Sequence, residues 1–316
     1  MSIQSLKQDI TNAVSKVIIG KEEVTELFLI SMLCRGHVLL EDVPGTGKTV
    51  LAKTISKLLG GQFRRLQFTP DVLPSDVTGV EFFNPKEKQF EVRIGPVMTN
   101  VLLVDEINRA TPRTQSSLLE VMEERQVTIG NETVQLPAPF FVLATQNPLE
   151  SQGTFPLPDA QLDRFFMSIH MGYPNFEEEL QIMRIYRGNE PLKEVTSYFE
   201  SLEEFVKLQD KVAEVLISED MEKYLLTIIH RTRGHEYIEA GVSPRGTLAF
   251  MRAVQARALL ENRSYVTPDD VKRVAPYVLS HRLQLNLEGS LRMTKREVME
   301  DILQTTEAPV EVGASS

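Results

Sequence analysis

The sequence predicts an α/β domain built on a parallel sheet, followed by a smaller domain made only of helices. Short apolar segments alternate with helical patterns over the first two-thirds of the chain, and strand-like segments stop at about residue 174. This alternation is typical of parallel strands that helices cover on both faces. We therefore expect the α/β domain at residues 1–174, the helical domain at 175–303 and a disordered polar tail at 304–316.

Five short, nearly continuous apolar segments are expected to form the sheet. They lie at residues 37–40, 65–68, 101–104, 140–144 and 165–167. Between the first two, an apolar stripe at helical spacing predicts a helix that ends at Gly60-Gly61, because glycine adopts the left-handed conformation that terminates helices. The stripe consists of Leu51, Ala52, Ile55, Leu58 and Leu59.

Two segments interrupt the alternation, and both are expected to be β-hairpins. Residues 80–95 alternate apolar and polar side chains around Asn84-Pro85-Lys86-Glu87, and residues 126–136 do so around Gly130-Asn131. The second is the clearer case, because a glycine with an asparagine favours a tight hairpin turn. Neither hairpin is needed to complete the sheet, so both are expected to project from it.

Capping residues mark the helix starts of the C-terminal domain. Ser218 precedes two acidic residues, and Thr267 is followed by a proline and, three positions on, by Asp270. Between these two helices, a third is predicted by an apolar stripe. Its members are Leu248, Met251, Val254, Ala258 and Leu259.

The composition is close to that of soluble globular proteins, with 42% hydrophobic and 25% charged residues in a chain of 316. No apolar run approaches the length of a membrane span, and the N-terminus lacks the apolar core of a secretory signal. Cys34 is the single cysteine, which excludes an internal disulfide and a cysteine-based metal site. We expect a cytoplasmic protein.

The net charge of -10 argues against broad binding to nucleic acid. Such binding depends on lysine and arginine side chains that neutralise phosphates, and acidic residues outnumber basic ones by 44 to 34. A local basic patch on an assembled surface stays compatible with this composition.

A phosphate-binding loop is predicted after the first strand, where a glycine-rich segment opens an amphipathic helix. Its glycines let backbone N–H groups point at phosphates, and the start of the helix favours anions. Lys48 is expected to reach the outer phosphates, and Thr49 to offer its hydroxyl to Mg²⁺. Asp42 stands where the usual motif has its first glycine. The loop residues expected to bind nucleotide are Val43, Pro44, Gly45, Thr46, Gly47, Lys48 and Thr49.

Two carboxylates follow the third predicted strand. Asp105 and Glu106 stand at its C-terminal end, which is the edge where open α/β sheets bind ligands. Asp105 is expected to hold the Mg²⁺ shell, and Glu106 to orient and polarise the attacking water. Acidic residues also end buried strands without any such role, so the prediction depends on the nearby phosphate loop. Together the two motifs predict a Mg²⁺-dependent enzyme that hydrolyses a nucleoside triphosphate.

With their surroundings, these motifs resemble the AAA+ ATPases, and most closely the MoxR family. The similarity runs through nearly the whole chain in the order of the family's motifs, and this family commonly accepts an acidic residue at the position of Asp42. The segments that carry it are 20–24, 41–49, 69–79, 104–110, 118–124, 144–148, 157–165 and 243–245.

The resemblance implies roles for three further polar residues. Asn147 matches the sensor-1 residue that positions the hydrolytic water, and Arg164 matches the arginine finger that reaches the γ-phosphate of a neighbouring subunit. Arg245 matches the sensor-2 arginine, which contacts nucleotide from the lid of the same chain. The alternatives are an ordinary turn at Asn147, an ion pair of Arg164 with Asp163 or another carboxylate, and a surface pair at Arg245.

The resemblance also assigns the segment at Ile18, Ile19 and Gly20 to the adenine base, although these residues are equally compatible with plain core. The hairpins near 80–95 and 126–136 resemble the helix-2 insert and the hairpin before sensor 1, which usually face a central pore or a partner. Exposed hairpins with no role are the alternative. The five histidines are scattered and lack the spacing of a metal site.

The function that the resemblance implies is that of a chaperone-like ATPase with ATP and Mg²⁺ as cofactors. It would work as a hexameric ring and remodel or mature a partner protein, often one with a von Willebrand factor A domain. One alternative is a ring ATPase that acts on nucleic acid or serves as a chelatase subunit. Another is a scaffold that binds nucleotide without hydrolysing it, which Glu106 argues against.

Overall fold

The computed structural model describes residues 3–43, 45–147 and 153–309. Its centre is a sheet of five parallel strands in the order β2-β5-β8-β1-β9, which confirms the predicted parallel sheet. The strands are β1 (Val38–Glu41), β2 (Phe63–Gln67), β5 (Val101–Asp105), β8 (Phe141–Gln146) and β9 (Met167–Ile169). The last strand begins two residues after its predicted start, because Phe165 and Phe166 belong to the segment that leads into it.

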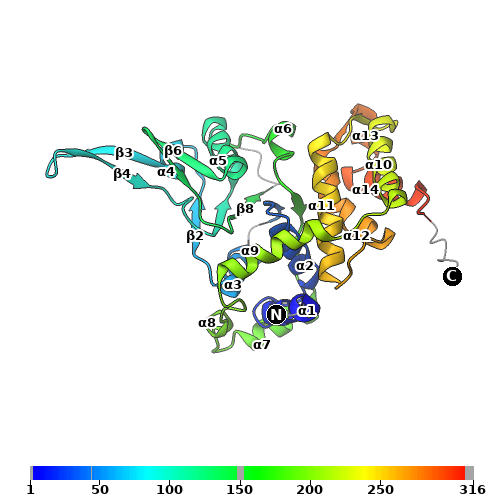
Figure 1. The fold of residues 1–316 in the computed structure, drawn as a ribbon, viewed down its shortest axis with the longest axis horizontal. Helices are drawn as coiled ribbons and strands as arrows, with labels where there is room; N and C mark the ends of the chain where they lie inside the picture. Colours follow the sequence, from blue (N-terminus) through cyan, green and yellow to red (C-terminus); the bar gives the residue numbers. More distant parts are fainter. Residues whose placement is uncertain (1–2, 44, 148–152, 310–316) are drawn as a thin grey trace.

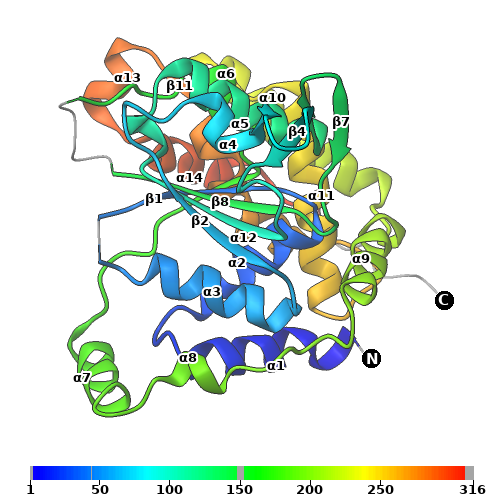
Figure 2. The same ribbon diagram turned by 90° about the vertical axis from the view of Figure 1, so that its left-hand side faces the viewer.

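The three central strands β1, β5 and β8 are buried on both faces and their alternate residues enter two different cores, whereas the edge strand β2 is half-exposed. In β5, Val101 and Leu103 pack into one core, whereas Leu102 and Val104 pack into the other. Figure 2 shows α1 to α3 on one side of the sheet and α4 and α5 on the other. Because neither face of these three strands meets water, they are nearly continuous in apolar residues. The helices are α1 (Ile3–Ser15), α2 (Glu22–Leu33), α3 (Lys48–Leu59), α4 (Pro74–Thr78) and α5 (Pro112–Glu124).

The two predicted hairpins are present and project from one end of the sheet (Figure 1). The first pairs β3 (Gly79–Asn84) with β4 (Gln89–Ile94), and the second pairs β6 (Gln126–Ile129) with β7 (Glu132–Gln135). Gly130 forms the tip of the second hairpin at φ +60°, where a side chain would be strained and would also meet Glu81 of the first hairpin. The tip of the second hairpin therefore lies against β3 of the first.

The helices after residue 175 occupy two places. The first group lies against the body, because Tyr186 donates to the carbonyl of Val17 and the backbone N–H of Tyr198 donates to the carbonyl of Leu58. The second group forms the lid at the far end of the molecule from the hairpins (Figure 1). The first group is α7 (Phe176–Ile185), α8 (Pro191–Glu194) and α9 (Leu202–Lys211); the lid holds α10 (Glu219–Gly234), α11 (Pro244–Leu260), α12 (Pro268–Leu279), α13 (Leu287–Arg292) and α14 (Lys295–Thr305).

Short elements complete the fold. The 3₁₀ turns are η1 (Ile107–Arg109), η2 (Val212–Glu214) and η3 (Ser280–Arg282); α6 spans Asp159–Leu162, β10 Ile238–Ala240 and β11 Gln284–Leu285. The predicted helix starts are confirmed, since the Ser218 hydroxyl accepts from the N–H of Met221 and Thr267 forms a capping box with Asp270. Within the described residues, no helix is both long enough and apolar enough to cross a membrane.

Two predictions about the C-terminal part are wrong in detail. Leu248 does not belong to the buried stripe of α11, because it is 58% exposed on another side of the helix. The tail does not begin at residue 304, because α14 continues to Thr305 and Thr306 is buried with its hydroxyl bonded to the Ile302 carbonyl. Residues 310–316 lie outside the described part. The domain boundary at 174/175 stays a prediction.

Candidate active site

A pocket of about 350 Å³ lies at the carboxyl edge of the sheet, where the phosphate loop, β2, β5 and β8 meet. It brings together seven predicted residues from segments that are far apart in the sequence. These are Gly45, Gly47, Lys48, Thr49, Asp105, Glu106 and Asn147. The remaining lining residues are Asp42, Val50, Arg65, Gln67 and Thr145.

The phosphate loop has the backbone that an anion cradle needs. Gly45 and Gly47 adopt φ of 91° and 90°, a region that side chains strain. A Cβ atom at either position would meet no heavy atom within 4 Å, so the backbone faces open space. Val43 and Thr46 close the turn, since the Thr46 hydroxyl donates to the Val43 carbonyl over 3.4 Å. Pro44 lies outside the described residues.

Lys48 is the first residue of α3 and lies across the loop. Its ammonium donates to the carbonyl of Asp42 over 2.9 Å. Burial lowers the pKa of Lys48, and the carboxylates of Asp42, Asp105 and Glu106 oppose that effect. A partly desolvated ammonium surrounded by oxygen atoms is suited to bind a phosphate, because charge–charge hydrogen bonds are stronger away from bulk water.

Asp42 has a structural task that explains an acidic residue at this position of the loop. Its side chain is only 7% exposed, and Oδ2 accepts from the backbone N–H groups of Met171 and Gly172 over 2.9 and 3.0 Å. The Met171 carbonyl in turn accepts from the buried ammonium of Lys21 over 2.7 Å. The loop is therefore tied to the chain after β9 and, through it, to the start of α2.

Ile19 and Gly20, the predicted base-binding residues, precede Lys21 and do not line the phosphate pocket. Gly20 adopts φ +70° and lies against Glu178 of α7, so that a Cβ would meet the carboxylate. Their contact with adenine stays a prediction.

Asp105 and Glu106 end β5 inside the pocket. Glu106 adopts φ 58° and ψ 52°, an uncommon conformation for a residue with a side chain and one that concentrates at functional sites. The Thr145 hydroxyl stabilises this turn, because it donates to Asp105 Oδ1 over 3.3 Å and accepts from the N–H of Glu106 over 3.0 Å. Asp105 and Glu106 both line the pocket beside the loop.

Arg65 and Gln67 were not predicted from the sequence as site residues. Arg65 Nε donates to Asp105 Oδ2 over 2.6 Å, and Gln67 Nε2 donates to Glu106 Oε2 over 2.7 Å. Both lie on β2, which pairs with β5, and their spacing of two residues puts them on one face of the strand. The sequence does contain a signal for this role, because Arg65 and Gln67 are polar residues at alternate positions of a predicted strand.

The donor set fits Mg²⁺ together with phosphates. Thr49 and Asp105 supply only oxygen atoms, and Mg²⁺ typically takes one or two protein oxygens and completes its shell with phosphate and water. Among the described residues, no group of three or more histidine, cysteine, aspartate or glutamate side chains forms a metal site of its own. A cation here would therefore depend on the nucleotide.

Arg164 and Arg245 do not line this pocket, and both form ion pairs with one carboxylate, that of Glu123. Arg164 Nη1 is 3.3 Å from Glu123 Oε2, and Arg245 Nη2 bonds to Glu123 Oε1. Ser243 at the start of α11 donates to Asp163 and brings Arg245 beside Arg164. The contact of Arg245 with the nucleotide of its own chain stays a prediction.

Glu123 lies at the edge of the sheet opposite the phosphate loop. It belongs to the last turn of α5, next to Met122, whose carbonyl accepts from His37 Nε2 over 3.0 Å. His37 directly precedes β1, so this turn lies at the amino ends of the strands. Burial lowers the pKa of His37 to about 3, and the neutral ring also accepts from the N–H of Val142 over 3.0 Å. The two arginines are therefore separated from the pocket of their own chain by the length of the strands.

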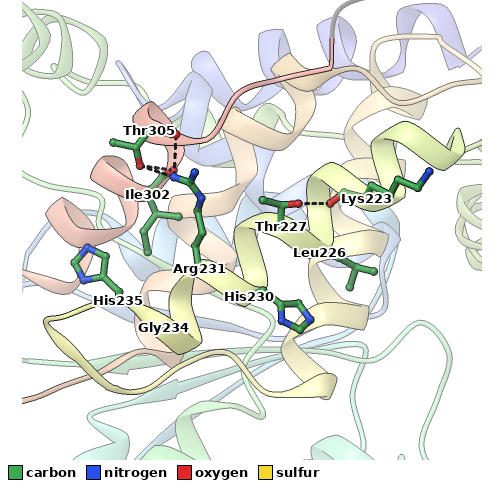
Figure 3. A pocket seen from close by; sticks show the side chains of 9 residues that line it. All are labelled: Lys223, Leu226, Thr227, His230, Arg231, Gly234, His235, Ile302 and Thr305. Carbon is green, nitrogen blue, oxygen red and sulfur yellow. Dashed lines mark hydrogen bonds between the residues drawn. The ribbon is translucent and has the colours of Figure 1, made fainter.

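A larger hollow of about 650 Å³ lies on the lid, between α10 and α14 (Figure 3). One of its lining side chains, Arg231, donates to the carbonyl and hydroxyl of Thr305. The hollow shares no residue with the phosphate loop. Size alone therefore does not identify the active site.

Known proteins share both parts of this architecture. Residues 37–167 match the family described as "ATPase family associated with various cellular activities (AAA)", and residues 230–304 match the "AAA lid domain". Chaperone MoxR1 of Mycobacterium tuberculosis is 40% identical over 306 residues, which cover 94% of this chain and 80% of that protein. The chain belongs to the MoxR family of AAA+ ATPases.

Two further relatives of this MoxR-family chain extend over its full architecture. The uncharacterised protein YeaC of Bacillus subtilis is 46% identical over 302 residues, 95% of this chain and 94% of that protein. A crystal structure of a candidate ATPase from Cytophaga hutchinsonii superposes with a TM-score of 0.89 at 39% identity, covering 98% of this chain and 96% of the other. The family match and this structural neighbour support ATPase activity in general.

Replacing Lys48 with alanine is expected to weaken ATP binding by about 30-fold or more. Removal of one partner from a desolvated charge pair costs roughly 2–5 kcal/mol, and about 1.4 kcal/mol corresponds to tenfold in affinity. Titration with a fluorescent ATP analogue measures the effect, and Lys53→Ala, an exposed position on the same helix, is the control. Equal affinity in the two variants would show that the loop does not hold the phosphates.

Proposed function

We propose that this MoxR-family ATPase hydrolyses ATP with Mg²⁺ at the junctions of a homo-oligomeric ring, a hexamer. Each site would combine the phosphate loop of one chain with Arg164 and Arg245 of its neighbour. The motion that accompanies hydrolysis would remodel or mature a partner protein, and the family resemblance favours a partner with a von Willebrand factor A domain.

The residues of one chain account for binding and for activation of water. Lys48 and the loop N–H groups would hold the phosphates, while Thr49 and Asp105 would hold Mg²⁺, which neutralises phosphate charge when bound. Glu106 would orient the attacking water and accept its proton, with Gln67 and Arg109 fixing the carboxylate over 2.7 and 3.1 Å. Asn147 lines the same pocket and would position that water.

The observation that carries the shared site is the placement of the two arginines. Both contact Glu123 at the amino edge of the sheet, whereas Lys48 and Glu106 lie at the carboxyl edge of the same sheet. An arginine that stabilises transition-state charge must reach the γ-phosphate. From their position in this structure, Arg164 and Arg245 would meet that requirement at the nucleotide of a second chain.

The first hairpin supports a protein as the client. Phe83 and Phe90 pair across its strands with ring centroids 5.4 Å apart, and they are 51% and 68% exposed. Exposed aromatic side chains on a projecting two-stranded ribbon are typical of protein-binding surfaces. A hairpin of this kind would follow the movement of the body to which β3 and β4 are joined.

ATP hydrolysis measured against protein concentration tests the shared site. The rate per chain is expected to rise steeply over the concentration range in which mass photometry shows single chains assembling into rings. A rate per chain that stays constant while the protein is monomeric would leave the ATPase assignment in place and overturn the junction.

A further inference from the structure

The segment that carries Arg164 is bound by the lid of its own chain. Arg282 of η3 is almost completely buried, with 2% of its side chain exposed. Its Nε donates to Asp163 Oδ1 over 2.8 Å, and Nη2 donates to the Phe165 carbonyl over 2.7 Å. One guanidinium thus forms hydrogen bonds with the residues on both sides of Arg164.

The same guanidinium forms further hydrogen bonds with backbone carbonyls. Nη1 donates to the carbonyl of Phe166 over 3.2 Å and to that of Val278, and Nη2 also reaches the carbonyl of Asp163 over 3.3 Å. Burial lowers the pKa of Arg282 to about 10, against the opposing effect of Asp163. The side chain is therefore charged at neutral pH, and its partner is a carboxylate.

Two other lid residues bind the same short segment. His281 Nε2 donates to the carbonyl of Phe165 over 3.1 Å, and the Ser243 hydroxyl donates to Asp163 Oδ2 over 2.9 Å. Ser243 is also the N-cap of α11, whose second residue is Arg245. Asp163 therefore connects the segment of Arg164, the start of the helix of Arg245 and the buried Arg282.

We infer that Arg282 is a positioning residue that holds Arg164 and Arg245 as one unit fixed to the lid. This inference rests on the proposed junction, because it concerns the delivery of both arginines to a neighbouring nucleotide. Arg282 touches neither the phosphate loop nor the nucleotide pocket. It acts through Asp163, so a movement of the lid in one subunit carries both arginines relative to the next subunit's phosphates.

The bonding pattern indicates why an arginine is needed at this position. A planar guanidinium can donate in several directions at once, which lets it bind a carboxylate and separate carbonyl groups together. A lysine keeps the charge but cannot form the same set of hydrogen bonds to the carboxylate and the carbonyl groups. Arg282→Lys is therefore expected to preserve the buried charge and lose the orientation of the Arg164 segment.

The test is hydrolysis by mixed rings. Arg282→Lys alone is expected to lower kcat at least tenfold at ring-forming concentration, with unchanged affinity for a fluorescent ATP analogue. A mixture of Arg282→Lys chains with Glu106→Gln chains should regain activity. At a mixed junction, the intact pocket of an Arg282→Lys chain receives well-placed arginines from a Glu106→Gln chain. A mixture of Arg282→Lys chains with Arg164→Ala chains should regain none, because neither chain supplies a working finger. Arg292→Lys, on the exposed face of the lid, is the control and should behave like the native chain.

The mixture of Arg164→Ala with Glu106→Gln separates the inference from the proposed function. If that mixture recovers activity and the mixture of Arg282→Lys with Glu106→Gln does not, Arg282 has no positioning role. Native kcat in Arg282→Lys would overturn the inference as well. If neither mixture recovers, the shared junction is wrong and the inference falls with it. Asp163→Asn, which keeps the size of the side chain, repeats the test if circular dichroism shows that Arg282→Lys does not fold.

Discussion

Replacing Glu106 with glutamine is expected to leave ATP binding unchanged and to lower kcat by about 10²–10⁴, the usual contribution of a general base. Glutamine has the same shape, and its side chain can still bond to Gln67 and Arg109, which hold Glu106 in this structure. What it loses is the ability to accept a proton from water. Binding contacts to the phosphates come from the loop, so affinity should not follow the rate.

Single-turnover hydrolysis and equilibrium binding measure these two quantities separately. Glu120→Gln, at an exposed position of α5, is the control and should keep both. Continued turnover in Glu106→Gln would assign the water-activating role to another group. A loss of ATP binding would instead show that the carboxylate supports the architecture of the loop.

The parts of the fold that depend on local patterns could be predicted from the sequence. The central strands are buried on both faces, which requires nearly continuous apolar segments, and such segments predicted β1, β5 and β8. The edge strand β2 is half-exposed and carries two arginines, so its apolar pattern is weaker and its predicted start lies two residues late. The glycine at the tip of the second hairpin and the caps at Ser218 and Thr267 are also local requirements of the backbone. For the same reason the phosphate loop was predictable, because its glycines, Lys48 and Thr49 are consecutive in the chain.

What the sequence did not reveal depends on contacts between distant residues. Glu123 is 122 positions from Arg245, and nothing near either residue indicates that they meet. Arg65 is 40 positions from Asp105, and their contact follows from the order of strands in the sheet rather than from spacing. Leu248 was included in the apolar stripe of α11 because helical spacing alone does not say which side of the helix meets solvent.

Replacing Arg164 with alanine is expected to lower the rate per chain by about 10³–10⁵ in assembled rings, the range known for arginines supplied by a neighbouring molecule. Nucleotide affinity should change little, because the phosphate loop of the same chain is intact. Arg292→Ala, which removes an exposed lid arginine paired with Glu288, controls for loss of charge. Steady-state hydrolysis at ring-forming concentration measures the difference between the two variants.

Mixing this variant with Glu106→Gln chains decides where the arginine acts. Each variant alone is inactive for a different reason, since one lacks a finger and the other lacks the water-activating carboxylate. At a mixed junction, an Arg164→Ala chain provides an intact pocket and a Glu106→Gln chain provides an intact Arg164. Activity that rises above both pure samples therefore requires the arginine to cross between chains. A mixture that stays at the sum of the two inactive samples would place Arg164 in its own chain's structure, as the partner of Glu123.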